Sequence, residues 1–202
     1  MSGVQYYYLG LELGANGLPY ELPLHPNFVH LTLGLFIVAV LFDIAATLLP
    51  FARPILNFLE LPALSSGFYD VGWYNLVAAV GVTFLTVTAG FFELWLALPA
   101  PAGKSAWGLT AGTTMFIHGV GGMALLGGMA GMSVWRGLQR YQWRREVHQQ
   151  VQWSYLLVGL VMLFALYVHG TLGAHLGEEF GVHNTAANLV RMGKNPNLFL
   201  KP

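Results

Sequence analysis

Histidine is the residue type through which this chain could do chemistry. The sequence has seven histidines and no cysteine, so haem iron or a metal ion would be bound through imidazole or carboxylate rather than thiolate. Gly122 lies one helical turn after His118, and Gly173 lies one turn after His169. A glycine on the same helix face as a histidine leaves room for a flat group beside the ring. Two such faces opposite each other are what bis-histidine ligation of a b-type haem requires.

These glycines also have a structural interpretation. Small residues let membrane helices pack closely without any cofactor, as Gly108 with Gly112 or Gly127 with Gly131 would. For a single histidine, a hydrogen bond across helices or to interfacial water is the simpler explanation. The cofactor hypothesis therefore depends on whether several histidines converge, and that depends on the elements that carry them.

The elements that carry the histidines are predicted to be transmembrane helices. Of the 202 residues, 55% are hydrophobic and 9% are charged, whereas a soluble domain has about 25% charged residues. Four apolar runs reach the roughly 20 residues needed to cross a bilayer. They cover residues 27–49, 73–98, 107–135 and 153–176. We expect an all-α integral membrane four-helix bundle over residues 27–176, with an N-terminal interfacial segment over 1–26 and a C-terminal tail over 177–202.

Prolines and arginines indicate the connections and the orientation. Pro50, Pro54 and Pro62 are expected to separate the first two helices, because proline lacks the backbone N–H. The connection between the third and fourth spans contains Arg136, Arg140, Arg144 and Arg145. Basic connections stay on the cytoplasmic side, which places both termini on the other side of a bacterial inner membrane or a thylakoid-type membrane. With a net charge of zero, the chain shows no sign of a nucleic-acid partner.

This topology brings five histidines to the outer half of the membrane. His118 lies about eleven residues into the third span, roughly 16 Å deep, and His169 lies some 10 Å before the end of the fourth. His30 and His175 are expected level with each other near the outer surface, with His25 close by. We expect His118 and His169 to be the axial ligands of haem b, and His30 with His175 to form a second pair.

Glu93 is expected to join the histidines, since the second span ends on the outer side. A carboxylate there could accept a hydrogen bond from a ligating histidine. It could also bind a metal ion together with His30, His175 and other histidines of the cluster, or carry protons to the outer surface. Asp43 is expected to be structural, paired with Arg53 or an arginine of a connection.

The first span and the residues before it resemble the opening of a bacterial four-helix membrane domain family of unknown function. That family opens with an HPxxVH motif, followed by an apolar run and an aspartate. The matching residues are His25, Pro26, Val29, His30 and Asp43. The family typically has a histidine early in its third helix, which His118 fits, and a glycine-rich end that residues 170–183 follow loosely. The resemblance implies a four-helix membrane fold and a role for these histidines, and it implies no activity.

Three functions stay open from the sequence. The first is a haem b electron-transfer protein that exchanges electrons at the outer surface, because the histidines gather toward one face. The second is a subunit of a larger respiratory or photosynthetic membrane complex, or a homo-oligomer, in which histidines hold haem or chlorophyll or only stabilise helix contacts. The third is a membrane enzyme or transporter with a non-haem metal ion. Because nucleophile motifs and phosphate-binding loops are absent from the sequence, we expect an electron carrier or complex subunit rather than a stand-alone enzyme.

Overall fold

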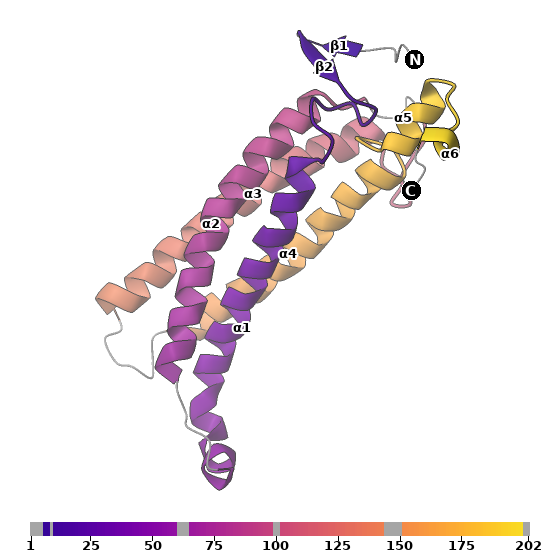
Figure 1. Cartoon of the computed structure of the whole chain (residues 1–202). Coiled ribbons are helices and arrows are strands. Elements are labelled where there is room, and N and C mark those ends of the chain that lie inside the picture. Colours follow the sequence, from indigo (N-terminus) through magenta and orange to yellow (C-terminus); the bar gives the residue numbers. More distant parts are fainter. Residues whose placement is uncertain (1–5, 9, 60–64, 99–101, 144–150, 200–202) are drawn as a thin grey trace. The chain divides into compact units, whose positions relative to one another are not determined.

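The computed structural model describes residues 6–8, 10–59, 65–98, 102–143 and 151–199. Four long helices dominate them, drawn from indigo to orange in Figure 1: α1 (Leu24–Phe58), α2 (Ser65–Trp95), α3 (Ala111–Leu138) and α4 (Trp153–Glu178). Each contains a stretch that is long and apolar enough to cross a membrane. Helices suit the bilayer because their backbone groups bond within the segment. The predicted all-α fold with four membrane-spanning helices is confirmed.

Short elements accompany the four helices. β1 (Tyr6–Tyr8) pairs antiparallel with β2 (Leu11–Leu13). A π-helical turn, η1 (Gln139–Trp143), continues α3, and two short helices, α5 (Thr185–Arg191) and α6 (Pro196–Phe199), follow α4. None of these short elements has a periodic pattern by which the sequence predicts it individually.

The first helix is longer than predicted. α1 continues through Pro50 and Pro54 to Phe58, so the expectation that these two prolines end the helix was wrong; Pro62 lies outside the described residues. The fixed φ of proline is compatible with a helix, and what is lost is one backbone donor per proline. Membrane helices tolerate this loss more readily than soluble ones.

The third helix begins and ends later than predicted, at Ala111 and Leu138 instead of residues 107 and 135. Arg136 belongs to α3 and Arg140 to η1, so neither lies in the connection to α4. Arg144 and Arg145 lie outside the described residues. Two of the four arginines are therefore held on a helix, where their side chains can pair with residues of other helices.

The chain divides into two compact units, each containing segments of all four helices. The first unit comprises Met1–Asn27, Val87–Gly122 and Val168–Pro202; the second comprises Phe28–Thr86 and Met123–Tyr167. The start of α1 and the end of α4 both belong to the first unit.

The second unit has a core built from all four helices. Phe36, Leu76, Met129 and Tyr155, one from each helix, are at most 1% exposed. Inside a membrane such contacts stabilise through van der Waals packing, because lipid tails are as apolar as the side chains.

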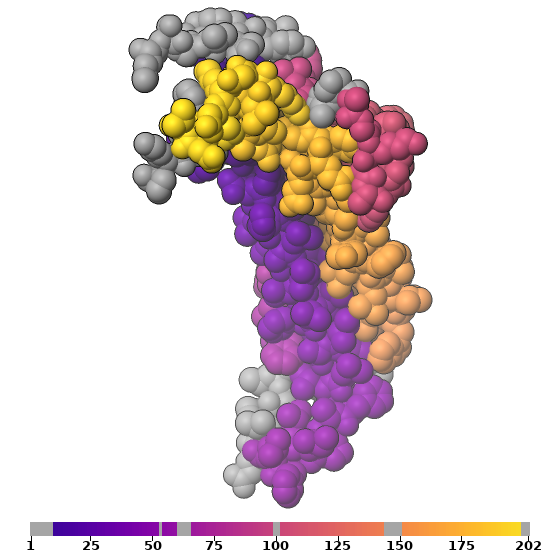
Figure 2. All heavy atoms as spheres, turned by 90° about the vertical axis from the view of Figure 1, so that its right-hand side faces the viewer, coloured from indigo at the N-terminus to yellow at the C-terminus, as the bar shows by residue number. Residues whose placement is uncertain are grey.

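The first unit has two smaller apolar clusters. One joins Leu13 and Leu18 to Leu96 at the end of α2. The other joins Ala111 of α3 to Phe180, just after α4. Figure 2 shows α5 and α6, in yellow, beside the end of α4. Described residues before α1 and after α4 thus pack into the first unit.

Candidate functional site

Three imidazole rings meet in the first unit, one each from α1, α3 and α4. The rings of His118 and His169 are stacked, with centroids 4.1 Å apart and planes 5° from parallel. The ring of His25 meets that of His118 edge-on, at 5.8 Å and 87°. All three residues are half-buried. We call these three residues the imidazole cluster; it contains the predicted ligand pair and adds His25 to it.

Each ring of the imidazole cluster lies against a glycine of a neighbouring helix. A Cβ atom on any of these glycines would come within 3.0 Å of the ring. The pairs are His118 with Gly173, His169 with Gly121, and His25 with Gly90. The predicted cofactor glycine Gly122 is farther, with a Cβ position 3.7 Å from the ring of His169. The space beside each of these glycines is therefore occupied by an imidazole ring from another helix.

One ring nitrogen of the cluster is buried without a hydrogen bond to the described residues. Nδ1 of His118 is buried and has no hydrogen-bond partner among the residues that the structure describes. Burying a polar nitrogen without a partner is unfavourable, so this atom is a candidate for binding a ligand. Within the described ranges, no group of three histidine, aspartate or glutamate side chains is arranged to hold a metal ion.

The stacked arrangement bears directly on haem binding. A haem ligated by His118 and His169 would lie between the edge nitrogens of the two rings. Here the rings meet through their faces at 4.1 Å, which leaves no space for a macrocycle between them. The pair supplies the right donor atoms, but as packed it does not fit a haem between the rings; they would have to separate and turn.

Glu93 holds the start of α1. Its Oε1 accepts hydrogen bonds from the backbone N–H groups of Leu24 at 2.7 Å and His25 at 3.0 Å, and from the Tyr20 hydroxyl at 2.9 Å. The first N–H groups of a helix lack intrahelical partners and carry partial positive charge, so they compensate this buried carboxylate. Burial, followed by the nearby Glu93 carboxylate, raises the pKa of Tyr20 above its usual value. Glu93 thus positions His25 through the backbone, a role that the sequence did not predict.

The two other predicted ligands lie outside the imidazole cluster. His30 belongs to the second unit and is exposed. Nδ1 of His175 lies 3.1 Å from the Glu179 carboxylate, and its ring meets that of Trp107 at 5.1 Å. Nε2 of His175 is buried, again with no partner among the described residues. His175 therefore forms a separate pair with Glu179, which the spacing of four residues on a helix permits.

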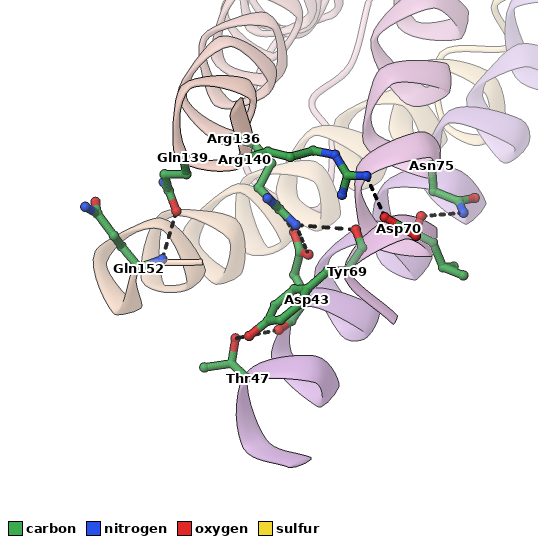
Figure 3. A network of polar contacts seen from close by, with 10 residues as sticks. Asp43, Thr47, Tyr69, Asp70, Asn75, Arg136, Gln139, Arg140 and Gln152 are labelled. Carbon is green, nitrogen blue, oxygen red and sulfur yellow. Dashed lines mark hydrogen bonds and ion pairs between the residues drawn. The ribbon is translucent and has the colours of Figure 1, made fainter. Parts of the chain in front are cut away.

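The second unit contains a buried ion pair, shown in Figure 3. Nε and Nη2 of Arg136 donate to the two carboxylate oxygens of Asp43, both at 3.1 Å, and both side chains are 0% exposed. Nη2 also donates to the Tyr69 carbonyl at 3.3 Å, and the Tyr155 hydroxyl donates to Asp43. The partner of Asp43 is thus an arginine on α3. The side chain of Arg53, the other predicted partner, lies outside the described part of the chain.

A glycine and a second ion pair complete this network. A Cβ atom on Gly72 of α2 would lie 2.5 Å from Oδ1 of Asp43, so the carboxylate occupies the space that a side chain would need. Nη2 of Arg140 donates to Asp70 at 2.6 Å, with side chains 17% and 49% exposed. Opposite charges here satisfy each other, which indicates a structural role.

Comparison with known proteins identifies the family. Residues 21–186 match the family described as "Predicted membrane protein (DUF2231)". The match includes all four long helices, the imidazole cluster and the buried ion pair. No curated protein and no solved structure matches the chain. The chain belongs to DUF2231, a family of predicted membrane proteins.

Proposed function

We propose that the protein is a membrane-bound electron-transfer protein that binds b-type haem through the imidazole cluster. The observation that carries this proposal is the meeting of three imidazoles from three helices, with Nδ1 of His118 buried and without a partner among the described residues. Ionisable side chains inside membrane spans are unfavourable and are usually retained for function. Among these side chains, neutral imidazole has the lowest free-energy cost of burial, and it is a common ligand of iron.

The residues of the first unit have distinct roles in this proposal. His118 and His169 are the proposed axial ligands, and a bound haem would supply one-electron redox chemistry. Gly121 and Gly173 allow the two helices to approach each other. Glu93 fixes the start of α1 and with it His25. The stacked rings leave no space for a macrocycle between them, so haem binding would require them to separate and turn.

A small metal ion is the second candidate ligand, because three imidazoles lie close together, although as packed the described side chains are not arranged to hold an ion. With metal–nitrogen bonds of about 2.0–2.1 Å, imidazoles bound to one ion lie a few ångströms apart. The centroid distances of 4.1 and 5.8 Å in the cluster are of this order. Binding of one ion would require the rings to rotate until their nitrogens face a common point. Imidazole suits zinc, copper, iron and nickel.

One absorption spectrum separates these possibilities. The full chain is expressed with added haem, purified in detergent, and measured oxidised and reduced. We expect a Soret band and a b-type α-band, with binding reduced at least about tenfold in His118→Ala and His169→Ala. His30→Ala, in the exposed position of the second unit, is the matched control and should bind normally.

Other outcomes of the same measurement would contradict the haem proposal. Folded protein without a Soret band excludes haem under these conditions. Stoichiometric copper or zinc by elemental analysis would then support the metal ion. A red absorption band, together with co-purification at fixed stoichiometry, would instead support a pigment-binding subunit of a larger complex.

A further inference from the structure

His183 connects two segments of the first unit through its ring. It follows α4 and has a left-handed backbone conformation, with φ of 52°. Its Nε2 lies 2.7 Å from the backbone carbonyl oxygen of Glu93, and its Nδ1 lies 3.2 Å from that of Asn16. One imidazole therefore bridges the last turn of α2 and the segment that precedes α1.

The chemistry of these two contacts depends on protonation. Carbonyl oxygens only accept hydrogen bonds, so each ring nitrogen must donate to make its bond. Neutral imidazole has one N–H group, and the imidazolium ion has two. The Glu93 carbonyl also lies at the C-terminal end of α2, where the helix dipole favours a cation. Both contacts are satisfied together only when His183 is protonated.

The segment that His183 holds is ordered by its own contacts. Nδ2 of Asn16 donates to the carbonyls of Tyr20 and Glu21, at 2.8 and 2.9 Å, and its Oδ1 accepts from the N–H of Leu18. Leu18 is 0% exposed and packs in the cluster at the end of α2. Residues 11–21 are therefore ordered in part by bonds among themselves; we call them the N-terminal segment.

Other charged groups near His183 have partners of their own. Arg191 of α5 and His183 line one cavity of the first unit. Arg191 donates to the carbonyl of Leu98, after the end of α2. On α2, the Glu93 carboxylate accepts from Tyr20 and from the start of α1. Asn16, on the N-terminal segment, is neutral. A change of charge on His183 thus leaves the bonds of Arg191 and Glu93 in place.

We propose that His183 is a protonation-controlled clasp between the N-terminal segment and the end of α2. The imidazolium form holds both carbonyls, and the neutral form holds only one. The bond to Asn16 is the longer of the two, so it is the one released. Lower pH tightens the docking of the N-terminal segment, and higher pH loosens it. This clasp operates whatever the imidazole cluster binds.

Hydrogen exchange of the N-terminal segment tests the clasp in the full chain in detergent. After correction for intrinsic exchange, protection of residues 11–21 should fall about fivefold as His183 loses its proton, the factor expected for one ordinary hydrogen bond. His183→Gln should show weak protection that no longer changes with pH. His30→Gln is the control and should keep the wild-type pH dependence.

A second measurement on the wild-type protein covers the case in which His183→Gln does not fold. Nitrogen NMR of histidine-labelled protein should show both ring nitrogens of His183 protonated over the pH range in which protection of the segment is highest. A neutral ring at the pH of highest protection, or the same pH dependence in His183→Gln as in the wild type, would overturn the proposal.

Discussion

The two units each place polar groups inside membrane-spanning helices, but they satisfy these groups differently. In the second unit, Asp43 and Arg136 carry opposite charges and share two hydrogen bonds. In the first unit, like groups meet: the rings of His118 and His169 stack face to face. Nδ1 of His118 has no partner among the described residues, and Nη1 of Arg136 has none either, but the charge of Arg136 is matched.

This difference separates a group that stabilises the fold from a group that is available to a ligand. A buried charge and its counter-charge depend on each other, so removal of either leaves the other uncompensated. Two stacked neutral rings have no charge to compensate, so removal of one ring destabilises the other much less. The ion pair should therefore determine stability, and the imidazole cluster should determine binding.

The largest expected effect comes from breaking the ion pair. Asp43→Ala leaves the Arg136 guanidinium buried without its counter-charge and should lower the free energy of unfolding by about 3–5 kcal/mol. Denaturant titration in detergent measures this change. Asp70→Ala, which breaks the partly exposed pair with Arg140, is the control and should change it by about 0–1 kcal/mol. Equal losses in the two variants would show that burial does not distinguish the pairs.

A smaller effect is expected from filling the space beside Asp43. Gly72→Ala places a methyl group 2.5 Å from Oδ1 of Asp43 and should destabilise the protein by about 1–3 kcal/mol. Gly81→Ala on the same helix meets nothing within 4 Å and should be neutral or slightly stabilising, because alanine favours helix over glycine. Thermal unfolding of both variants checks this. A stable Gly72→Ala would mean that the ion pair can move without loss.

The smallest effect on stability is expected in the imidazole cluster. His169→Leu replaces a neutral ring by an apolar side chain and should lower the free energy of unfolding by about 1 kcal/mol, although it should abolish haem binding. The same denaturant titration measures both this variant and Asp43→Ala. If His169→Leu were as destabilising as Asp43→Ala, the cluster would be structural and the contrast between the units would disappear.

Features with a periodic or compositional signal could be predicted from the sequence. The four apolar runs predicted the helices, and a rise of about 1.5 Å per residue was sufficient to bring His118 and His169 to similar depths. Depth along the helix axis does not distinguish His25 from His30, because it ignores the direction in which each side chain points. Five residues apart on a helix, they point in directions about 140° apart, so His25 can face the cluster while His30 is exposed.

Contacts between distant segments could not be predicted in this way. Glu93 meets the start of α1 across 68 and 69 residues, and His183 meets Glu93 across 90. Neither contact has a sequence pattern, because a single side chain meets backbone atoms whose positions depend on the tertiary fold. The same applies to the choice of Arg136 among the arginines as the partner of Asp43.

The pairing of Asp43 with Arg136 also has a consequence for biogenesis. The two residues are separated by 93 positions, and a chain grows at about 5–20 residues per second. About 5–20 seconds therefore pass between the synthesis of Asp43 and the synthesis of Arg136. A lone carboxylate inside the hydrocarbon core is unfavourable by about 3 kcal/mol. Until the third helix arrives, the first helix therefore lacks the counter-charge that compensates Asp43 in the folded protein.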